Sequence, residues 1–594
     1  MMQAIRPLSG AFCLLAGIAS AMSFTVSPEG YVGMSALPAA STSYLWTALA
    51  VCFALFFRYV YIRKALRPSA LGVAMGLVFG VVNALGGVLF AYDSWDMSAV
   101  QWALTLLRAL GQSLPMIALF DWLDGALRSG RGEPSEKGCI PAHMLVMIAC
   151  WLPYLIAFYP GTVCWDLGEM VAQFFGQTEM DTWHPVFTTW LIGGCVWLGR
   201  LAGSDNLGAA LFTLLQTVML SYALARAVDF LRRRGVKKAL WLSALAFFAL
   251  TPLWGGYAQF ISKDTLYTAA LLLFALNVLD VLLGQMKHVR RTAAELFVWG
   301  LLSCLLRSNG LYVVLPTALA VALFSRRAWL VSALAGCVAC ALLFSNVLIP
   351  ALGIRDETAS GIYSVCFQQS ARTLRDHADE ITPEEYAAID QVLDAENLPQ
   401  LYEPWISDPV KFTFRQYGQG REAEMAALAP YREVWLEMFG KYPLTYLESF
   451  FAGNVSYYAF TPKLEGETYH NQAGNRLVFE TYELGDSRGD DPRFLDTTQI
   501  AALEPVRQLL AMFARGWRHI PVLGMLYACA AYTWLLVGAA VSIVRQKRWR
   551  VLIGFLPALL TLGVCMLGPV NDYFRYFLPI AAMALPLLGA AAGE

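Results

Sequence analysis

The chain has 594 residues, of which 57% are hydrophobic and only 15% are charged, whereas ordinary soluble domains carry about 25% charged residues. Its formal net charge is -1, from 43 basic and 44 acidic residues, so we expect no nucleic-acid partner. This composition excludes an ordinary water-soluble protein and indicates an integral membrane protein.

Long apolar runs separated by short basic loops recur along the chain. A helix needs about 20 mostly apolar residues to cross a bilayer, and about fourteen runs of this kind can be placed in the sequence. The first, at 11–24, also has the form of a signal peptide, but no clean small-residue cleavage site follows it, so we interpret it as an uncleaved span. The sequence therefore predicts an all-α polytopic membrane protein with about fourteen transmembrane helices.

Basic loops predict the orientation of these helices. Lysine and arginine collect on the cytoplasmic side of membrane proteins, and four clusters are dense enough to use: 58–67, 232–238, 287–291 and 545–550. The run at 185–201 is one of two apolar runs between the external loop at 160–183 and the cytoplasmic cluster at 232–238. Two full crossings would return the chain to the outer side, so one of the runs cannot cross. We therefore predict that the run at 185–201 lies at the outer interface or re-enters it without fully crossing.

This orientation divides the chain into four predicted parts, in a cell membrane and with the large polar segment outside the cytoplasm. The polar segment should form a mainly α or α+β extracytoplasmic domain, with a helix that starts in a capping box at Thr382 and Glu385. The parts are accessory transmembrane helices at 1–138, a membrane core at 139–350 with a first external loop at 160–184, the extracytoplasmic domain at 351–517, and C-terminal transmembrane helices at 518–594.

Ionisable and polar residues gather at four external corners of the predicted bundle. Such groups are costly in hydrocarbon, so a cluster where the bundle meets water marks a candidate site. The corners contribute Asp166, Glu169, Gln173 and His184-Pro185 from the first loop, then Lys263 and Asp264, then Arg307 and Asn309, and finally Arg575 and Tyr576.

Two carboxylates and two arginines at one membrane face suit a specific task. A carboxylate can deprotonate an acceptor hydroxyl, while a guanidinium can hold the phosphate of a lipid-borne donor. Burial would raise the pKa of Asp166 toward that of a useful base, and a nearby Lys263 or arginine would lower it. The sequence leaves the balance of these effects open.

At these residues the chain resembles the GT-C superfamily of membrane glycosyltransferases, which use polyprenyl-phosphate-linked sugars at the outer membrane face. The order of Asp166, His184-Pro185 and Asp264 is similar to that family's order of an acidic loop residue, a His-Pro helix start and a second acidic turn. The resemblance covers roughly 145–324. The double-acidic form of the loop motif is absent, because Leu167 follows Asp166.

The resemblance implies a GT-C-like bundle and inverting transfer of a hexosyl or pentosyl group, with Asp166 as the catalytic base. Asp264 would assist substrate binding, and Arg307 or Arg575 would stabilise the leaving phosphate. The implied partners are a polyprenyl-phosphate-linked sugar, membrane lipids, and a glycan, lipid or protein acceptor of the cell envelope. No cofactor is indicated, and the need for a divalent metal stays open.

Plainer interpretations compete with this one. Asp166 could only cap a helix, and Lys263, Arg307 and Arg575 could be interfacial anchors. The whole chain could be a transporter, a lipid or polysaccharide flippase, or a polymerase. Aromatic residues of the polar segment could stack on a glycan or only fill a core: Trp405, Tyr417, Trp435, Tyr457 and Tyr458.

Overall fold

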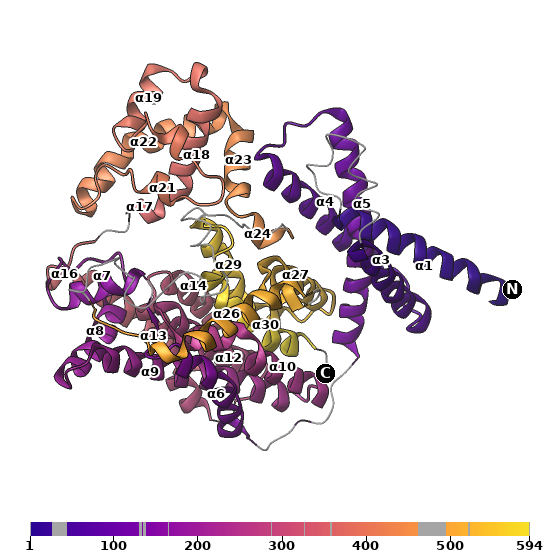
Figure 1. The fold of residues 1–594 in the computed structure, drawn as a ribbon, viewed down its shortest axis with the longest axis horizontal. Helices are drawn as coiled ribbons and strands as arrows, with labels where there is room; N and C mark the ends of the chain where they lie inside the picture. The colour runs from indigo at the N-terminus through magenta and orange to yellow at the C-terminus, as the bar shows by residue number, and fades with distance from the viewer. Residues whose placement is uncertain are drawn as a thin grey trace.

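The computed structural model describes residues 2–25, 44–129, 134, 138–163, 165–286, 288–325, 327–356, 359–460, 495–520, 523–568 and 570–592. Over these residues the protein is all-α apart from one sheet of two short strands. Figure 1 shows an N-terminal group of helices, a large bundle, and a separate helical unit that lies over one end of the bundle.

Nine helices in the described part of the chain are long and apolar enough to cross a membrane, so this is a multi-pass membrane protein. A tenth span is present if α10 (Lys238–Leu250) and α11 (Pro252–Gln259), which meet at a bend of 47°, count as one. The nine are Trp46–Arg63, α4 (Ala70–Tyr92), α5 (Ala99–Arg128), α6 (Ile140–Ala157), α9 (Asp205–Arg233), α12 (Lys263–Leu282), Ala328–Ala351, Trp549–Leu567 and α30 (Phe574–Ala591).

The predicted number of about fourteen crossings is larger than this, because some apolar runs form short helices. Three helices, and the apolar stretch of the first helix, have 10–17 residues, fewer than the roughly 20 that a perpendicular span needs. They are Gly10–Thr25, α8 (Val186–Leu201), α14 (Gly310–Phe324) and α27 (Cys529–Arg545). The run at 185–201, predicted not to cross fully, is thus one of the short helices.

The N-terminal group consists of α1 (Met2–Thr25), α3 (Tyr44–Phe57), α4 and α5, and it lies beside the bundle (Figure 1). Glycines spaced four residues apart let α4 approach α5 closely. A side chain at Gly80 would place its Cβ 2.2 Å from the Ala109 carbonyl oxygen, and one at Gly76 would lie 2.4 Å from Ile117. Small residues at such a helix interface allow the backbones to pack in van der Waals contact.

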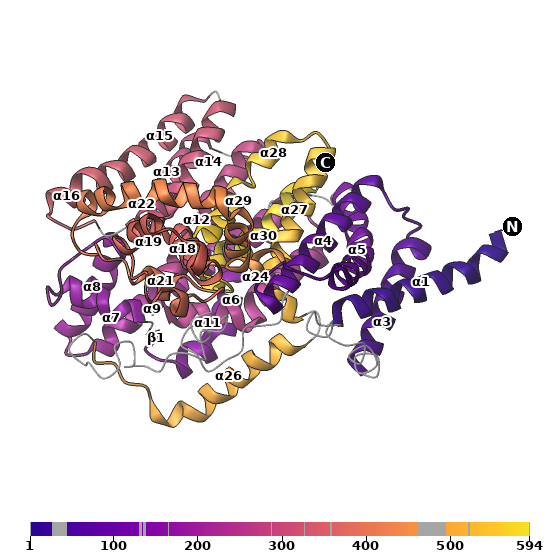
Figure 2. The same cartoon turned by 90° about the horizontal axis from the view of Figure 1, so that it is seen from above.

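Helix α12 is the centre of the bundle. Every residue from Asp264 to Asp280 is buried, against α9, α13 (Val289–Leu306) and α30. A helix that is apolar on all sides is stable only when other helices surround it. The C-terminal helices α27 and α30 pack within this bundle, so the middle and C-terminal parts of the sequence build one membrane core (Figure 2).

The helical unit spans 359–452 and has a hydrophobic core of its own, in which Phe367, Leu393 and Tyr431 are fully buried. The predicted capping box is confirmed: Thr382 accepts from the Glu385 backbone N–H, and Glu385 accepts from that of Thr382. The unit contains α17 (Ala359–Ile362), α18 (Ser364–Asp376), α19 (Pro383–Asp390), α20 (Leu398–Leu401), α21 (Asp408–Lys411), α22 (Arg421–Lys441) and α23 (Pro443–Ala452).

This unit is shorter than the domain predicted at 351–517. Residues 461–494 lie outside the described part of the chain. Helix α26 (Glu504–His519), which belongs to the predicted domain, packs against α6 and α11 of the bundle. Its buried Arg507 donates to the carbonyl of Ala157 at the end of α6, over 2.9 Å. The last part of that segment therefore lies on the surface of the membrane bundle and not in the helical unit.

A buried arginine joins the helical unit to the N-terminal group. Arg372 of α18 is 1% exposed and pairs with Asp93, the residue after α4, at 2.6 Å and with Glu448 of α23 at 2.9 Å. Glu448 also accepts from the backbone N–H of Trp95. A buried charge requires this degree of compensation, so the unit has a defined attachment to the membrane helices.

Candidate functional site

A two-residue sheet brings the first two acidic corners together. Strand β1 (Thr162–Val163) pairs in parallel with β2 (Phe260–Ile261), with Thr162 opposite Phe260. Gly161 precedes β1 with φ +129°, and a side chain there would collide with Thr213. Only glycine fits such a position. Because α7 (Trp165–Phe174) and α12 follow these strands directly, their first turns lie next to each other.

Buried amides of neighbouring helices hold this sheet. The Gln216 amide of α9 donates to the carbonyls of Ala258 and Phe260 at 2.9 and 2.8 Å. Gln259 accepts from the backbone N–H of Thr162 at 2.8 Å. Both glutamines are fully buried, where a hydrogen bond is electrostatically stronger than in water, so these bonds restrict the backbone of the sheet.

Asp166, Lys263 and His184 form the first half of the site. The Lys263 ammonium lies 3.0 Å from the Asp166 carboxylate and 3.0 Å from Nδ1 of His184. Asp166 is in the first turn of α7, where the helix dipole favours a negative charge. His184 is 4% exposed and precedes α8. The first two corners of the sequence thus meet.

Asp264, Arg307 and Arg575 form the second half. Arg307, which follows α13, makes an ion pair with Asp264. Arg575 of α30 lies 3.7 Å from Asp166 and 4.0 Å from Asp264, between the two carboxylates. Together with the first half, these residues are called the ion cluster below: Asp166, His184, Lys263, Asp264, Arg307 and Arg575.

Tyr576 packs against both arginines of the ion cluster. The guanidinium of Arg307 lies 4.3 Å from the centre of the Tyr576 ring, and that of Arg575 lies 4.9 Å from it and donates to the Tyr576 hydroxyl at 3.0 Å. An aromatic face stabilises a guanidinium and restricts its position. Tyr576 therefore orders the cationic side of the cluster.

Charges in the cluster are set by its geometry. Burial acts to raise the pKa of Asp166, but Lys263 and Arg575 outweigh it and hold that pKa well below its usual range. Burial and the Lys263 ammonium lower the pKa of His184 to about 3. At neutral pH Asp166 is therefore ionised, and His184 is neutral and accepts a hydrogen bond from Lys263.

The cluster as a whole carries an excess of one positive charge at neutral pH. Lys263, Arg307 and Arg575 are cations, and Asp166 and Asp264 are anions. An arrangement of this kind attracts a monoanion and stabilises further negative charge on it. Among the described residues, no three histidine, cysteine or carboxylate side chains gather closely enough to hold a metal ion.

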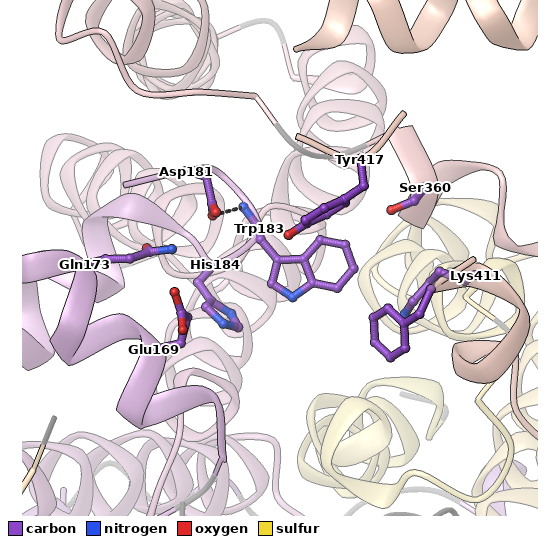
Figure 3. Close-up of a pocket in the computed structure, with 9 residues that line it drawn as sticks. Glu169, Gln173, Asp181, Trp183, His184, Ser360, Lys411 and Tyr417 are labelled. Atoms are coloured by element: carbon purple, nitrogen blue, oxygen red, sulfur yellow. Dashed lines mark hydrogen bonds between the residues drawn. The ribbon is translucent and has the colours of Figure 1, made fainter. Parts of the chain in front are cut away.

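A pocket of about 300 Å³ lies beside the ion cluster and shares His184 with it. Glu169 and Gln173 of α7 line one wall, so the structure brings these two predicted residues to the site (Figure 3). Asp181 and Trp183 come from the loop before α8, and the opposite wall comes from the helical unit: Ser360, Lys411, Phe412 and Tyr417.

The remaining predicted residues have other positions. Asn309 begins α14 and makes no hydrogen bond with the cluster within the described chain. Of the aromatic residues, Tyr417 lines the pocket, while Tyr457 is fully buried in the bundle core and Trp435 bonds to Gln369 of the unit. Trp405 packs on Phe90, and Tyr458 on Phe451.

Sequence patterns missed the contributions of Asp181, Lys411 and Phe412. Each of these residues lies more than a hundred positions along the chain from the opposite wall of the pocket. Spacing within its own segment therefore does not identify it as a pocket residue. The Asp408-Pro-Val-Lys411 turn was the available signal, since Lys411 ends α21 and is directed toward Trp183, 5.2 Å from the ring centre.

The sequence matches one known family. The profile of DUF6020, described as a family of unknown function, covers residues 175–591. This region includes the ion cluster except Asp166. No curated protein and no solved structure matches the chain.

Proposed function

We propose that this chain, which belongs to the DUF6020 family, is an inverting membrane glycosyltransferase that moves a sugar from a polyprenyl-phosphate carrier to a cell-envelope acceptor. The observation that carries the proposal is the ion cluster, in which three cations surround two carboxylates at one end of the bundle. The order of its residues along the chain is similar to that of GT-C enzymes, which supports the same function.

The charge of the cluster suits the donor. A carrier-linked sugar phosphate is a diester with one negative charge, and it leaves as a monoester with about -1.5 to -2. The excess positive charge on Lys263, Arg307 and Arg575 balances the diester and stabilises the charge that develops on the leaving group.

Asp166 acts as the base, and donor binding activates it. While Lys263 and Arg575 both face its carboxylate, the pKa of Asp166 is low and the group is a weak base. A donor phosphate competes for these two cations, so its arrival raises the pKa of Asp166. The base thus becomes effective only when the sugar to be transferred is in place.

The transfer is a direct displacement. The acceptor oxygen forms a bond to the anomeric carbon, and its proton passes to Asp166. The bond from that carbon to the phosphate oxygen breaks, with its electron pair on the polyprenyl phosphate, which Lys263, Arg575 and Arg307 hold. Asp264 positions the two arginines through its contacts with both.

The position of the cluster supports a reaction on the outer face. Asp280, near the far end of α12, pairs with Arg233, and Arg548 donates to the Ala591 carbonyl at the far end of α30. The basic loops at 232–238 and 545–550 therefore lie about 30 Å from the cluster, across one span. Basic loops face the cytoplasm, which supports an outer position for the cluster and the helical unit.

Transport is the main competing function. Transporters bind their cargo near the midplane of the membrane, at broken helices related by an internal repeat. Here four of the five charged groups lie in the first turns of α7, α12 and α30, and Arg307 follows the end of α13. This location favours chemistry at the membrane surface.

The proposal is tested with full-length protein in lipid nanodiscs and a panel of polyprenyl-phosphate-linked hexoses and pentoses. We expect release of polyprenyl phosphate from at least one donor, and a loss of at least about 100-fold in Asp166→Asn. Asp96→Asn, at an exposed carboxylate between α4 and α5, is the matched control. Equal rates in Asp166→Asn, or no release from any donor with envelope acceptors present, would overturn the proposal in favour of transport.

A further inference from the structure

The pocket beside the ion cluster has aromatic walls. The Trp183 ring meets Tyr417 edge to face, with 5.9 Å between ring centres, and lies 6.3 Å from Phe412. Tyr417 is 51% exposed and Phe412 is 67% exposed, so neither ring is buried in a hydrophobic core. Exposed aromatic rings at a concave surface are typical of ligand sites.

Hydrogen-bond acceptors line the other side of the pocket. Asp181 is 9% exposed and accepts from the backbone N–H of Trp183 at 3.0 Å (Figure 3). Burial raises the pKa of this carboxyl. Glu169 accepts from the Thr178 hydroxyl at 3.1 Å, and the Gln173 amide lies on the same wall. Each of these groups has further capacity to accept a hydrogen bond from a hydroxyl.

The positive charge of Lys411 in the pocket is neutralised by a carboxylate of its own helix. The Lys411 ammonium makes an ion pair of 2.6 Å with Asp408, one turn earlier in α21. It also lies 5.2 Å from the Trp183 ring centre and 5.0 Å from that of Phe412. The ammonium therefore orders the aromatic walls, and the pocket gains no net attraction for an anion from it.

A fixed connection holds the two walls together. The backbone of Asp181 and Thr182 pairs with Arg355, through a hydrogen bond of 2.9 Å from Thr182 to the Arg355 carbonyl. The Thr182 hydroxyl donates to Asp356, which also pairs with Arg421 of α22. The loop before α8 is thus tied to the helical unit, so the pocket is preformed.

From these features we infer that the pocket binds one neutral sugar ring of a glycan acceptor, and that it delivers the acceptor hydroxyl to Asp166 past His184. Aromatic faces pack on the apolar faces of a sugar, and the carboxylates and amide accept from its hydroxyls. A volume of about 300 Å³ is at the lower end for ligand pockets and suits about one ring.

This inference rests on the proposed function for the fate of the sugar, but binding can be measured without any donor. The probes are methyl glycosides of glucose, galactose, mannose and N-acetylglucosamine, added to full-length protein in nanodiscs. Saturation-transfer NMR reports which glycosides contact the protein. We expect at least one to bind, and its affinity to fall about tenfold in both Trp183→Ala and Tyr417→Ala, because each substitution removes an aromatic wall.

Two further variants make the measurement decisive. Tyr386→Ala removes an exposed tyrosine of α19 outside the pocket and should bind like the parent. Trp183→Phe keeps an aromatic ring in case Trp183→Ala fails to fold, and should bind with an intermediate affinity. Absence of binding by all four glycosides, or equal binding by parent, Trp183→Ala and Tyr417→Ala, overturns the inference.

The two proposals fail differently. Donor cleavage that depends on Asp166, without glycoside binding to the pocket, would leave the glycosyltransferase in place and overturn the sugar pocket. Pocket-dependent glycoside binding without cleavage of any donor would keep the pocket and overturn glycosyl transfer.

Discussion

The ammonium of Lys263 lies 3.0 Å from the carboxylate of Asp166, and this contact joins the first turns of two helices. We predict that Lys263→Gln lowers donor cleavage by about 10- to 100-fold, because one charge-assisted bond to the phosphate is lost. Rates with a saturating donor would be compared with those of Lys238→Gln, an exposed lysine at the start of α10. A drop of similar size in both variants would contradict this role.

His184 should make stability depend on pH. Its pKa is about 3 in the folded chain against 6.5 for a free side chain, so the unfolded chain binds the proton first as pH falls. The free energy of unfolding therefore keeps its full value above about pH 6.5 and decreases below that pH, by about 1 kcal/mol near pH 5.5. Thermal unfolding of His184→Gln should lack this component, since an amide oxygen can accept from Lys263 without titrating. An unchanged pH profile in that variant would disprove the assignment.

Arg307 should be needed for stability as well as for phosphate binding. Its partner Asp264 is 1% exposed, and without Arg307 this buried carboxylate keeps, among the described residues, only the more distant Arg575, at 4.0 Å, which costs up to about 3–5 kcal/mol. We therefore expect Arg307→Ala to unfold at a clearly lower temperature than the parent. The double variant Arg307→Ala with Asp264→Asn should recover part of that loss, because the uncompensated charge is gone. No recovery would mean that packing on Tyr576 dominates.

Arg372→Met should loosen the attachment of the helical unit. Loss of this guanidinium leaves Asp93 and Glu448 without their buried partner, again a cost of about 3–5 kcal/mol. Arg375→Met is the matched control: Arg375 also pairs with Asp93, but 31% of its side chain is exposed, so we expect a loss below about 1 kcal/mol. Thermal unfolding and protease sensitivity of 359–452 would measure the difference.

The sequence predicted the charged residues of the site, because the free-energy cost of burying charge in a membrane limits where such residues can stand. Charged residues are costly in hydrocarbon and gather at the ends of apolar runs, so Asp166, Lys263, Asp264 and Arg575 could be recognised as candidates from their positions alone. Their mutual contacts follow from the helices α7, α12 and α30, whose first turns lie at one face. Helix count was harder to predict, because α8, α14 and α27 are apolar but short, and composition does not reveal length after folding.

The pocket could not be predicted as a unit. Its walls come from the loop at 181–183 and from residues 411–417 of the helical unit, and contacts over such a separation leave no periodic pattern. The attachment of Arg372 to Asp93, 279 residues away in the sequence, was missed for the same reason. Local spacing indicates helices and their ends, whereas partner choice across the chain depends on the complete fold.

One wall of the pocket and the ion cluster are built by different parts of the chain, so substitutions can affect one without the other. The ion cluster belongs to the membrane bundle, while Lys411, Phe412 and Tyr417 belong to the helical unit with its own core. Under the proposed function, substitutions at these three positions would therefore change acceptor binding without disturbing the charges assigned to the carrier phosphate. Members of the family that share the proposed function would then differ in acceptor through this short stretch and keep the same donor chemistry.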